Sequence, residues 1–190
     1  MSALSVPNIL TYGRILAVPA VVACFSLPNT PTPTSRWIAL AIFAAAAITD
    51  FFDGYLARAW GQQSSLGRML DPIADKLLVA ACLLILVDAR TIHGWTVIAA
   101  VIILCREILV SGLREFLAEL RVSVPVTWLA KWKTTAQLVS LGFLIVGDAG
   151  RSVYPWCVET GEILLWVSAL LTLYTGWDYF RSGIRHVMDE

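Results

Sequence analysis

The chain has 190 residues, of which 58% are hydrophobic and only 15% are charged, and its mean hydropathy is +0.73. A typical soluble domain has about 45–50% apolar and about 25% charged residues, so this composition excludes an ordinary soluble protein and indicates an integral membrane protein. Fourteen basic and fourteen acidic residues give a net charge of zero. The chain as a whole therefore does not attract nucleic acid electrostatically, and we expect no nucleic-acid partner.

Six apolar stretches, separated by charged residues and by Pro and Gly clusters, predict six helices. In chain order they are residues 9–27, 37–58, 69–87, 95–117, 128–146 and 162–180, with residues 147–161 as the connection between the last two. A helix needs about 20 apolar residues to cross a bilayer, and each stretch has about that length. We therefore predict one all-α integral membrane domain over residues 1–190, with six transmembrane helices in contact with membrane lipids.

The distribution of Lys and Arg outside the helix centres predicts the orientation of these helices. One side, which includes the N-terminus, has nine such residues: Arg14, Arg58, Arg68, Arg114, Arg121, Lys131, Lys133, Arg181 and Arg185. The other side has only Arg36, Arg90 and Arg151. Because cytoplasmic loops carry the excess of basic residues, we predict that both termini are cytoplasmic.

Four aspartates lie at the predicted cytoplasmic ends of the second and third helices. Asp50 and Asp53 are three residues apart, and Asp71 and Asp75 are four apart, so each pair projects from one face of its helix. A carboxylate within a span costs several kcal/mol unless it faces water or a cation, so these acids are functional candidates. Residues 57–67 form a short connection, which predicts antiparallel neighbouring helices whose aspartate pairs converge.

Four converging carboxylates need positive charge to remain ionised together, and two divalent cations would supply it. All-oxygen ligands suit hard ions such as Mg²⁺ or Mn²⁺, and two such ions serve in phosphoryl chemistry. The alternative is that the aspartates cap helices or pair with Arg58 and Arg68 at the membrane edge, which we regard as the minority interpretation for two helically spaced pairs.

The residues between the two aspartate pairs suit a phosphate-containing substrate. Gly54, Ala57 and Gly67 leave room for a ligand close to the backbone. Arg58 can bind phosphate oxygens through two N–H groups, and Ser64 offers a hydroxyl. For the three small residues taken alone, ordinary helix packing is the better explanation.

The complete pattern is Asp50-x2-Asp53-Gly54-x2-Ala57-Arg58-x8-Gly67-x3-Asp71-x3-Asp75. All eight fixed positions match, so the chain is identified as resembling the CDP-alcohol phosphotransferase family. The resemblance implies a homodimeric six-helix membrane enzyme that displaces CMP from a CDP-linked donor with an alcohol. It also implies that the four aspartates bind two metal ions and that Asp75 is in addition the general base.

Basic residues of the fourth and fifth helices indicate a phosphorylated acceptor. Arg106 and Arg114 are eight residues apart and share a helix face, while Glu107 is offset by about 100° and is placed to orient one of them. Buried cations need anions, and with the aspartates committed to metal, a phosphate on the acceptor is the economical partner of Arg106, Arg114, Lys131 and Lys133. For Arg114 and the two lysines, anchoring at the cytoplasmic surface is an equally good interpretation.

Four further segments narrow the acceptor, namely residues 6–14, 106–115, 128–137 and 173–178. They resemble the bacterial members of the family that form phosphatidylglycerol phosphate. The resemblance implies transfer of the phosphatidyl group of CDP-diacylglycerol to glycerol 3-phosphate, with release of CMP, at the cytoplasmic face of the bacterial cytoplasmic membrane. Related enzymes that form cardiolipin or use inositol phosphate remain alternatives, and a divalent-metal transporter is a remote one.

Two polar residues at the start of the first predicted helix are candidates for contacting the donor. Asn8 and Thr11 would touch the nucleotide or its phosphates if this helix lies beside the one that carries Asp50. Helix capping is the alternative for both residues, and for Asn8 it is equally good.

Overall fold

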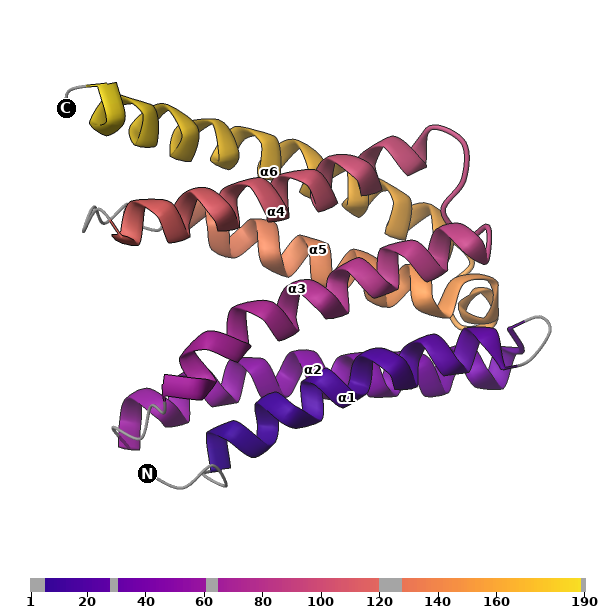
Figure 1. Cartoon of the computed structure of the whole chain (residues 1–190). Coiled ribbons are helices and arrows are strands. Elements are labelled where there is room, and N and C mark those ends of the chain that lie inside the picture. The colour runs from indigo at the N-terminus through magenta and orange to yellow at the C-terminus, as the bar shows by residue number, and fades with distance from the viewer. Residues whose placement is uncertain (1–5, 28–30, 61–64, 120–127, 189–190) are drawn as a thin grey trace. The chain divides into compact units, whose positions relative to one another are not determined.

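The computed structural model describes residues 6–27, 31–60, 65–119 and 128–188 (Figure 1). For residues 6–9, 50–60, 65–68, 119, 130–131, 178 and 182–188 within these ranges, only the backbone is described. The elements are α1 (Val6–Ser26), α2 (Pro33–Trp60), α3 (Ser65–Asp88), α4 (Thr96–Glu119), α5 (Trp128–Val146), the 3-10 helix η1 (Gly147–Ser152) and α6 (Cys157–Met188). These ranges contain no β-strand, so the predicted all-α class is confirmed for the described residues.

The predicted helix interiors are confirmed, whereas several predicted ends are wrong. α5 has the predicted bounds, but α2 begins four residues earlier than predicted and α6 begins at Cys157. The start of α2 is fixed by Thr32, whose Oγ1 accepts a hydrogen bond from the backbone N–H of Ser35 at 3.1 Å. Capping and proline placement set such ends, and neither is visible in hydropathy.

The predicted connection at residues 147–161 is also wrong, because most of it is helical. η1 covers its first part, and the first turns of α6 cover its last part. Glu159 and Glu162 interrupt the apolar pattern, but an acidic residue near the N-terminus of a helix is favourable. The break between α5 and η1 lies at Gly147, which has a φ of 54°.

The helices form two compact units, which we describe separately. Unit 1 comprises residues 1–92 and 141–158, and unit 2 comprises residues 93–140 and 159–190. The prediction of a single domain stays a prediction.

In unit 1, α1 packs against both α2 and α3. Its apolar core includes Val21, Ala39 and Leu78, which are at most 2% exposed. One end of the unit is held by Arg36, whose guanidinium donates to Thr91 Oγ1 at 3.0 Å and to the carbonyl of Ile145 at 3.2 Å. This buried arginine therefore ties the start of α2 to the segments that follow α3 and end α5.

In unit 2, α4 and α6 run parallel (Figure 1). Hydrogen bonds join Thr96 to Glu162, Arg106 to Thr172 and Arg114 to Tyr179, with sequence separations of 66, 66 and 65 residues. Such a constant separation is possible only if the two helices proceed in the same direction. Ser140 of α5 donates to the carbonyl of Gly161 at 2.7 Å, which attaches α5 to the start of α6.

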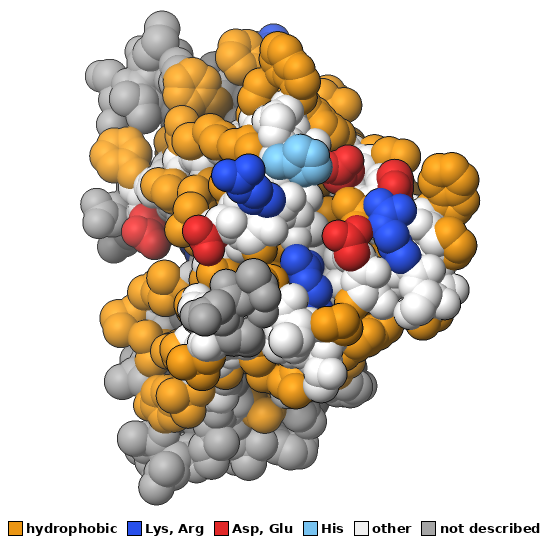
Figure 2. Space-filling model, turned by 90° about the vertical axis from the view of Figure 1, so that its right-hand side faces the viewer, with side chains coloured by type: hydrophobic (Ala, Val, Ile, Leu, Met, Phe, Trp, Pro, Cys, Tyr) orange, Lys and Arg blue, Asp and Glu red, His pale blue; other side chains and the backbone are white. Residues whose placement is uncertain are grey.

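Two described helices contain segments long and apolar enough to cross a membrane, Thr96–Ala118 and Cys157–Arg181. Only 28% and 33% of the most apolar part of these two segments is buried, which favours contact with lipid over a place in a soluble core. Leu84, Ile108 and Leu170 are each more than 60% exposed, and Figure 2 shows hydrophobic side chains over much of the visible face. Six spans and cytoplasmic termini stay predictions.

Candidate functional site

Two of the four predicted metal ligands have described side chains, Asp71 and Asp75 of α3. They are one helical turn apart, and both are half-buried. Their carboxylate oxygens are the donor type that a hard divalent cation prefers, so the chemistry of this pair fits the predicted metal. Among the side chains that the structure describes, no group of three or more His, Cys, Asp or Glu residues is placed to hold an ion.

Thr11 lies against one of these aspartates. Its hydroxyl donates a hydrogen bond to Asp71 Oδ1 at 2.6 Å, and the residue is 2% exposed. The sequence predicted that Thr11 contacts the donor nucleotide, and it did not predict this contact with a metal-ligand candidate. The packing of α1 against α3 brings the two residues together.

Arg14 is a candidate that the sequence analysis did not single out. It lies three residues after Thr11 on α1 and is only 1% exposed, so both side chains belong to the buried face of this helix. From the sequence, Arg14 was counted only among the basic residues that predict the orientation of the helices. A cation within an apolar stretch marks a functional candidate in the same way as an aspartate does, and this signal was present at Arg14.

Nine further predicted site residues have no described side chain. Asp50, Asp53, Gly54, Ala57 and Arg58 belong to the last part of α2, Gly67 to the first turn of α3, Asn8 to α1 and Lys131 to α5, and for these only the backbone is described. Ser64 lies outside the described residues altogether. Convergence of the four aspartates therefore stays a prediction. Asn8 is the third residue of α1, so its backbone lies within the helix rather than directly before it.

Arg106, the first of the predicted acceptor residues, is held against α6 in unit 2. Its Nε donates to the carbonyl of Thr172 at 3.1 Å, and its Nη2 donates to Thr175 Oγ1 at 3.2 Å. Gly176 makes room for this arrangement, because a Cβ at that position would lie 3.2 Å from Cγ and 3.3 Å from Nε of Arg106. The arginine thus has a fixed place within the helical core.

Glu107 provides an anion for two of the predicted acceptor residues. Lys133 of α5 donates a hydrogen bond to Glu107 Oε1, and Arg106 Nη1 lies 3.7 Å from the same oxygen. The Arg106 and Lys133 side chains are 11% and 7% exposed. A protein carboxylate therefore accompanies these cations, and its contact with Arg106 agrees with the predicted place of Glu107 beside one of the arginines.

Arg114 also contacts α6, eight residues further along α4 than Arg106. Its Nη2 donates to the hydroxyl of Tyr179 at 3.0 Å, and its guanidinium carbon lies 5.5 Å from the centre of that ring. Arg106 and Arg114 both face α6, so the predicted shared face is confirmed. No motif in the sequence pointed to Tyr179 as a contact of Arg114.

Comparison with known proteins identifies the family. The model of the CDP-alcohol phosphatidyltransferase family matches residues 4–174. The chain belongs to this family. Similar curated proteins include one from Cereibacter sphaeroides, 41% identical with 98% of both chains covered, one from Rickettsia bellii, 44% identical with 94% of both covered, and one from Escherichia coli, 39% identical with 98% of both covered. Each of the three is named CDP-diacylglycerol–glycerol-3-phosphate 3-phosphatidyltransferase.

Membership of the CDP-alcohol phosphatidyltransferase family confirms the resemblance that the aspartate pattern indicated. The family match extends well beyond the pattern itself, from the start of α1 to the middle of α6. A helical membrane protein is consistent with both the family and the apolar helices.

Proposed function

We propose that the chain transfers the phosphatidyl group of CDP-diacylglycerol to glycerol 3-phosphate, forming phosphatidylglycerol phosphate and CMP. The observation that carries this proposal is the similarity, over nearly the whole length, to relatives that bear the name of this activity. The buried cations of unit 2 support it, because a phosphate on the acceptor is the anion that they would bind.

The metal centre of the proposed enzyme consists of the four aspartates of the pattern. Asp50, Asp53, Asp71 and Asp75 would hold two Mg²⁺ ions, with Mn²⁺ as a substitute. Bound ions would supply positive charge that neutralises the diphosphate and stabilises the charge that develops on the leaving CMP. The half-buried carboxylates of α3 are consistent with such a site.

Asp75 is in addition the proposed general base. It accepts the proton of the primary hydroxyl of glycerol 3-phosphate while that oxygen attacks the β-phosphorus. The new phosphorus–oxygen bond forms as the bond to the CMP oxygen breaks, so the reaction proceeds by direct displacement without a covalent enzyme intermediate.

The proposed donor subsite surrounds the metal ligands. The residues that we assign to CDP-diacylglycerol are Asn8, Thr11, Gly54, Ala57, Arg58, Ser64 and Gly67. Arg58 provides paired donors for phosphate oxygens, and the small residues allow close approach. The acyl chains remain in the bilayer.

The proposed acceptor subsite consists of Arg106, Arg114, Lys131 and Lys133. A guanidinium has five N–H donors, and in the part of the chain that the structure describes Arg106 uses two of them in hydrogen bonds with α6. The remaining donors suit the oxygens of a phosphate. Arg114 lies over the ring of Tyr179. Its side chain is exposed, whereas Arg106 is half-buried and Lys133 is buried.

We further propose a homodimer in the bacterial cytoplasmic membrane, with six spans, cytoplasmic termini and an active site that faces the cytoplasm. The excess of basic residues on one side supports this orientation. The four aspartates of the pattern all lie on the side with more Lys and Arg, which is the predicted cytoplasmic side.

A screen of labelled acceptors tests the proposed activity. Purified protein in detergent is supplied with CDP-diacylglycerol, Mg²⁺ and, in separate reactions, glycerol 3-phosphate, inositol phosphate or phosphatidylglycerol. We expect release of CMP and a phosphorylated lipid product only with glycerol 3-phosphate, and none with an Asp75→Ala control. Turnover of one of the other acceptors instead would assign the chain to a different branch of the family.

A further inference from the structure

We propose that Glu107 is a positioning residue of the acceptor subsite, which holds Arg106 and Lys133 side by side so that one phosphate meets both cations. This inference rests on the proposed function, because it assigns a role within that same subsite. Glu107 acts through these two cations, and we propose no contact between Glu107 and the substrate.

The contacts of Glu107 place two cations at one carboxylate oxygen. Lys133 reaches Oε1 from α5, whereas Arg106 approaches it from the preceding position on α4, with its Nη1 at 3.7 Å. Glu107 therefore joins two helices at the level of the subsite. Its side chain is 20% exposed, so the group is not sealed within the core.

Charge explains why a carboxylate is needed at this point. Two cations with little exposure repel each other and lose hydration, and an anion between them offsets both effects. Arg106 and Lys133 contribute two positive charges and Glu107 one negative charge, so the group of three retains a charge of +1. The group is therefore fixed in place and still attracts a phosphate.

Geometry explains why Glu107 determines the position of Lys133 more than that of Arg106. Hydrogen bonds to Thr172 and Thr175 hold Arg106 on α6. A lysine has a flexible four-carbon chain, so the position of its ammonium depends on the group that accepts its hydrogen bonds. The bond from Lys133 to Glu107 brings this ammonium next to the fixed guanidinium.

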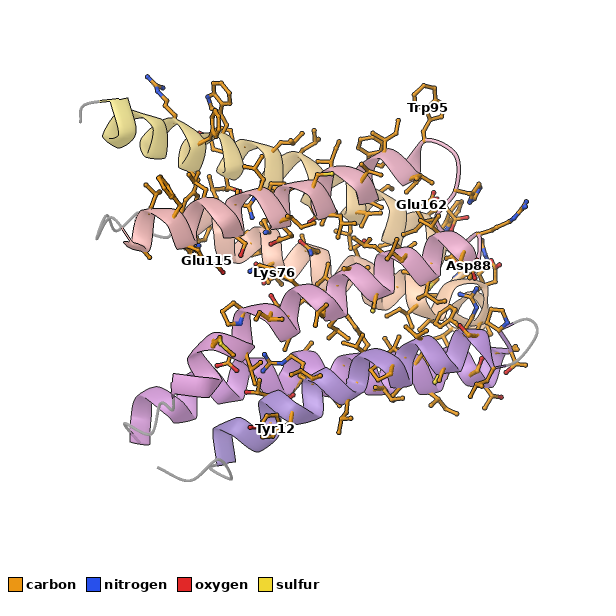
Figure 3. The ribbon with its side chains drawn as sticks, in the orientation of Figure 1. Tyr12, Lys76, Asp88, Trp95, Glu115 and Glu162 are labelled. Carbon is orange, nitrogen blue, oxygen red and sulfur yellow. The ribbon has the colours of Figure 1, made fainter. Side chains whose placement is uncertain are left out.

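The kinetic test uses Glu107→Gln, which keeps the size of the side chain and removes its charge. We expect the KM for glycerol 3-phosphate to rise about tenfold, while kcat and the KM for CDP-diacylglycerol change by less than about twofold. Glu162→Gln is the matched control. Glu162, which is labelled in Figure 3, is a carboxylate of the same unit, and it accepts a hydrogen bond from Thr96 at 3.2 Å. The control should leave all three constants unchanged.

A double variant tests whether Glu107 acts through Lys133. In a Lys133→Met background, Glu107→Gln should raise the KM for glycerol 3-phosphate by less than about twofold further. A full tenfold rise in that background would overturn the inference, and so would an equal rise in the two KM values of the single variant. A glutamate with a merely structural role would lower the Tm without this selectivity for the acceptor.

Glu107→Asp keeps the test decisive if the glutamine variant does not fold. Its carboxylate is one methylene shorter, so we expect a selective rise of about threefold in the KM for glycerol 3-phosphate, and an unchanged KM would contradict the inference. Failure of the proposed function is distinguishable, because the wild-type protein would then form no phosphatidylglycerol phosphate. An active wild type with an unaffected Glu107→Gln variant refutes only the role of Glu107.

Discussion

One hydrogen bond orients a predicted metal ligand. The hydroxyl of Thr11 donates to Asp71 Oδ1, which restricts the orientation of this carboxylate. Residues that orient a ligand in this way contribute to metal affinity although they do not touch the ion. Thr11 would thus support the proposed metal site in addition to the donor contact predicted for it.

Thr11→Val should weaken metal binding, because valine has the same shape as threonine and lacks the hydroxyl. We expect the affinity for Mn²⁺ to fall about tenfold, measured by titration of the purified protein with detection of free Mn²⁺ by electron paramagnetic resonance. Thr11→Ser keeps the donor and should bind Mn²⁺ like the wild type. Equal affinities of the valine and wild-type proteins would remove Thr11 from this role.

Asp75→Asn separates the role of base from that of metal ligand. An asparagine still offers a carbonyl oxygen to a metal but accepts no proton, so donor binding should persist while kcat falls at least about a hundredfold. Asp53→Asn should instead weaken Mn²⁺ binding as well. Donor binding and single-turnover rates measured in detergent distinguish the two variants, and near-normal chemistry in Asp75→Asn would leave that residue as a ligand only.

At the scale of the helices, the apolar stretches predicted where each helix lies, but both ends only for α5. The ends depend on local groups, such as Thr32 before α2 and the positive φ of Gly147 after α5. The acidic start of α6 was interpreted as a connection, because hydropathy does not register the favourable place of Glu159 in a first turn.

Gly147→Ala should destabilise the protein at the junction of α5 and η1. A side chain there is strained by the positive φ, and its Cβ would clash with Arg36 Nη1 and lie 3.3 Å from Arg36 Cζ. Gly94 has a φ of 55° but nothing within 4 Å, so Gly94→Ala measures strain alone, about 1 kcal/mol. Thermal unfolding in detergent should show a distinctly larger loss of Tm for Gly147→Ala. Equal losses would mean that Arg36 adjusts without cost.

The candidate site was less predictable than the helices, since its partners come from different elements. The aspartate pattern is local in sequence and was therefore visible. The bond from Thr11 to Asp71 spans 60 residues, and the bond from Lys133 to Glu107 spans 26. Only packing brings such pairs together, so spacing along one helix predicted a basic face with Glu107 beside it, but not the bond between Glu107 and Lys133.

At the scale of the whole molecule, the predicted metal ligands and the predicted acceptor residues belong to different compact units. The four aspartates belong to unit 1, and the residues predicted to bind the acceptor phosphate belong to unit 2. Each unit has its own arginine contacts, the buried Arg36 in the first and the part-buried Arg106 in the second.

The predicted orientation of the spans gives a test at this scale. Fluorescent protein fused after the C-terminus should fluoresce in bacterial cells, because it folds in the cytoplasm, and alkaline phosphatase inserted within η1 should be active, because it requires the oxidising side. A fusion at residues 120–127 provides the cytoplasmic counterpart within the chain. Active phosphatase at both internal positions would exclude the six-span arrangement.

Metal-dependent turnover tests the central claim most directly. Purified protein is treated with EDTA, freed of the chelator, and supplied with CDP-diacylglycerol and labelled glycerol 3-phosphate, with and without Mg²⁺. Without divalent ions, clustered carboxylates would repel the diphosphate that they must bind, so we predict no turnover. Addition of Mg²⁺ should restore formation of phosphatidylglycerol phosphate and CMP in equal amounts. Full activity in the metal-free preparation would contradict the account.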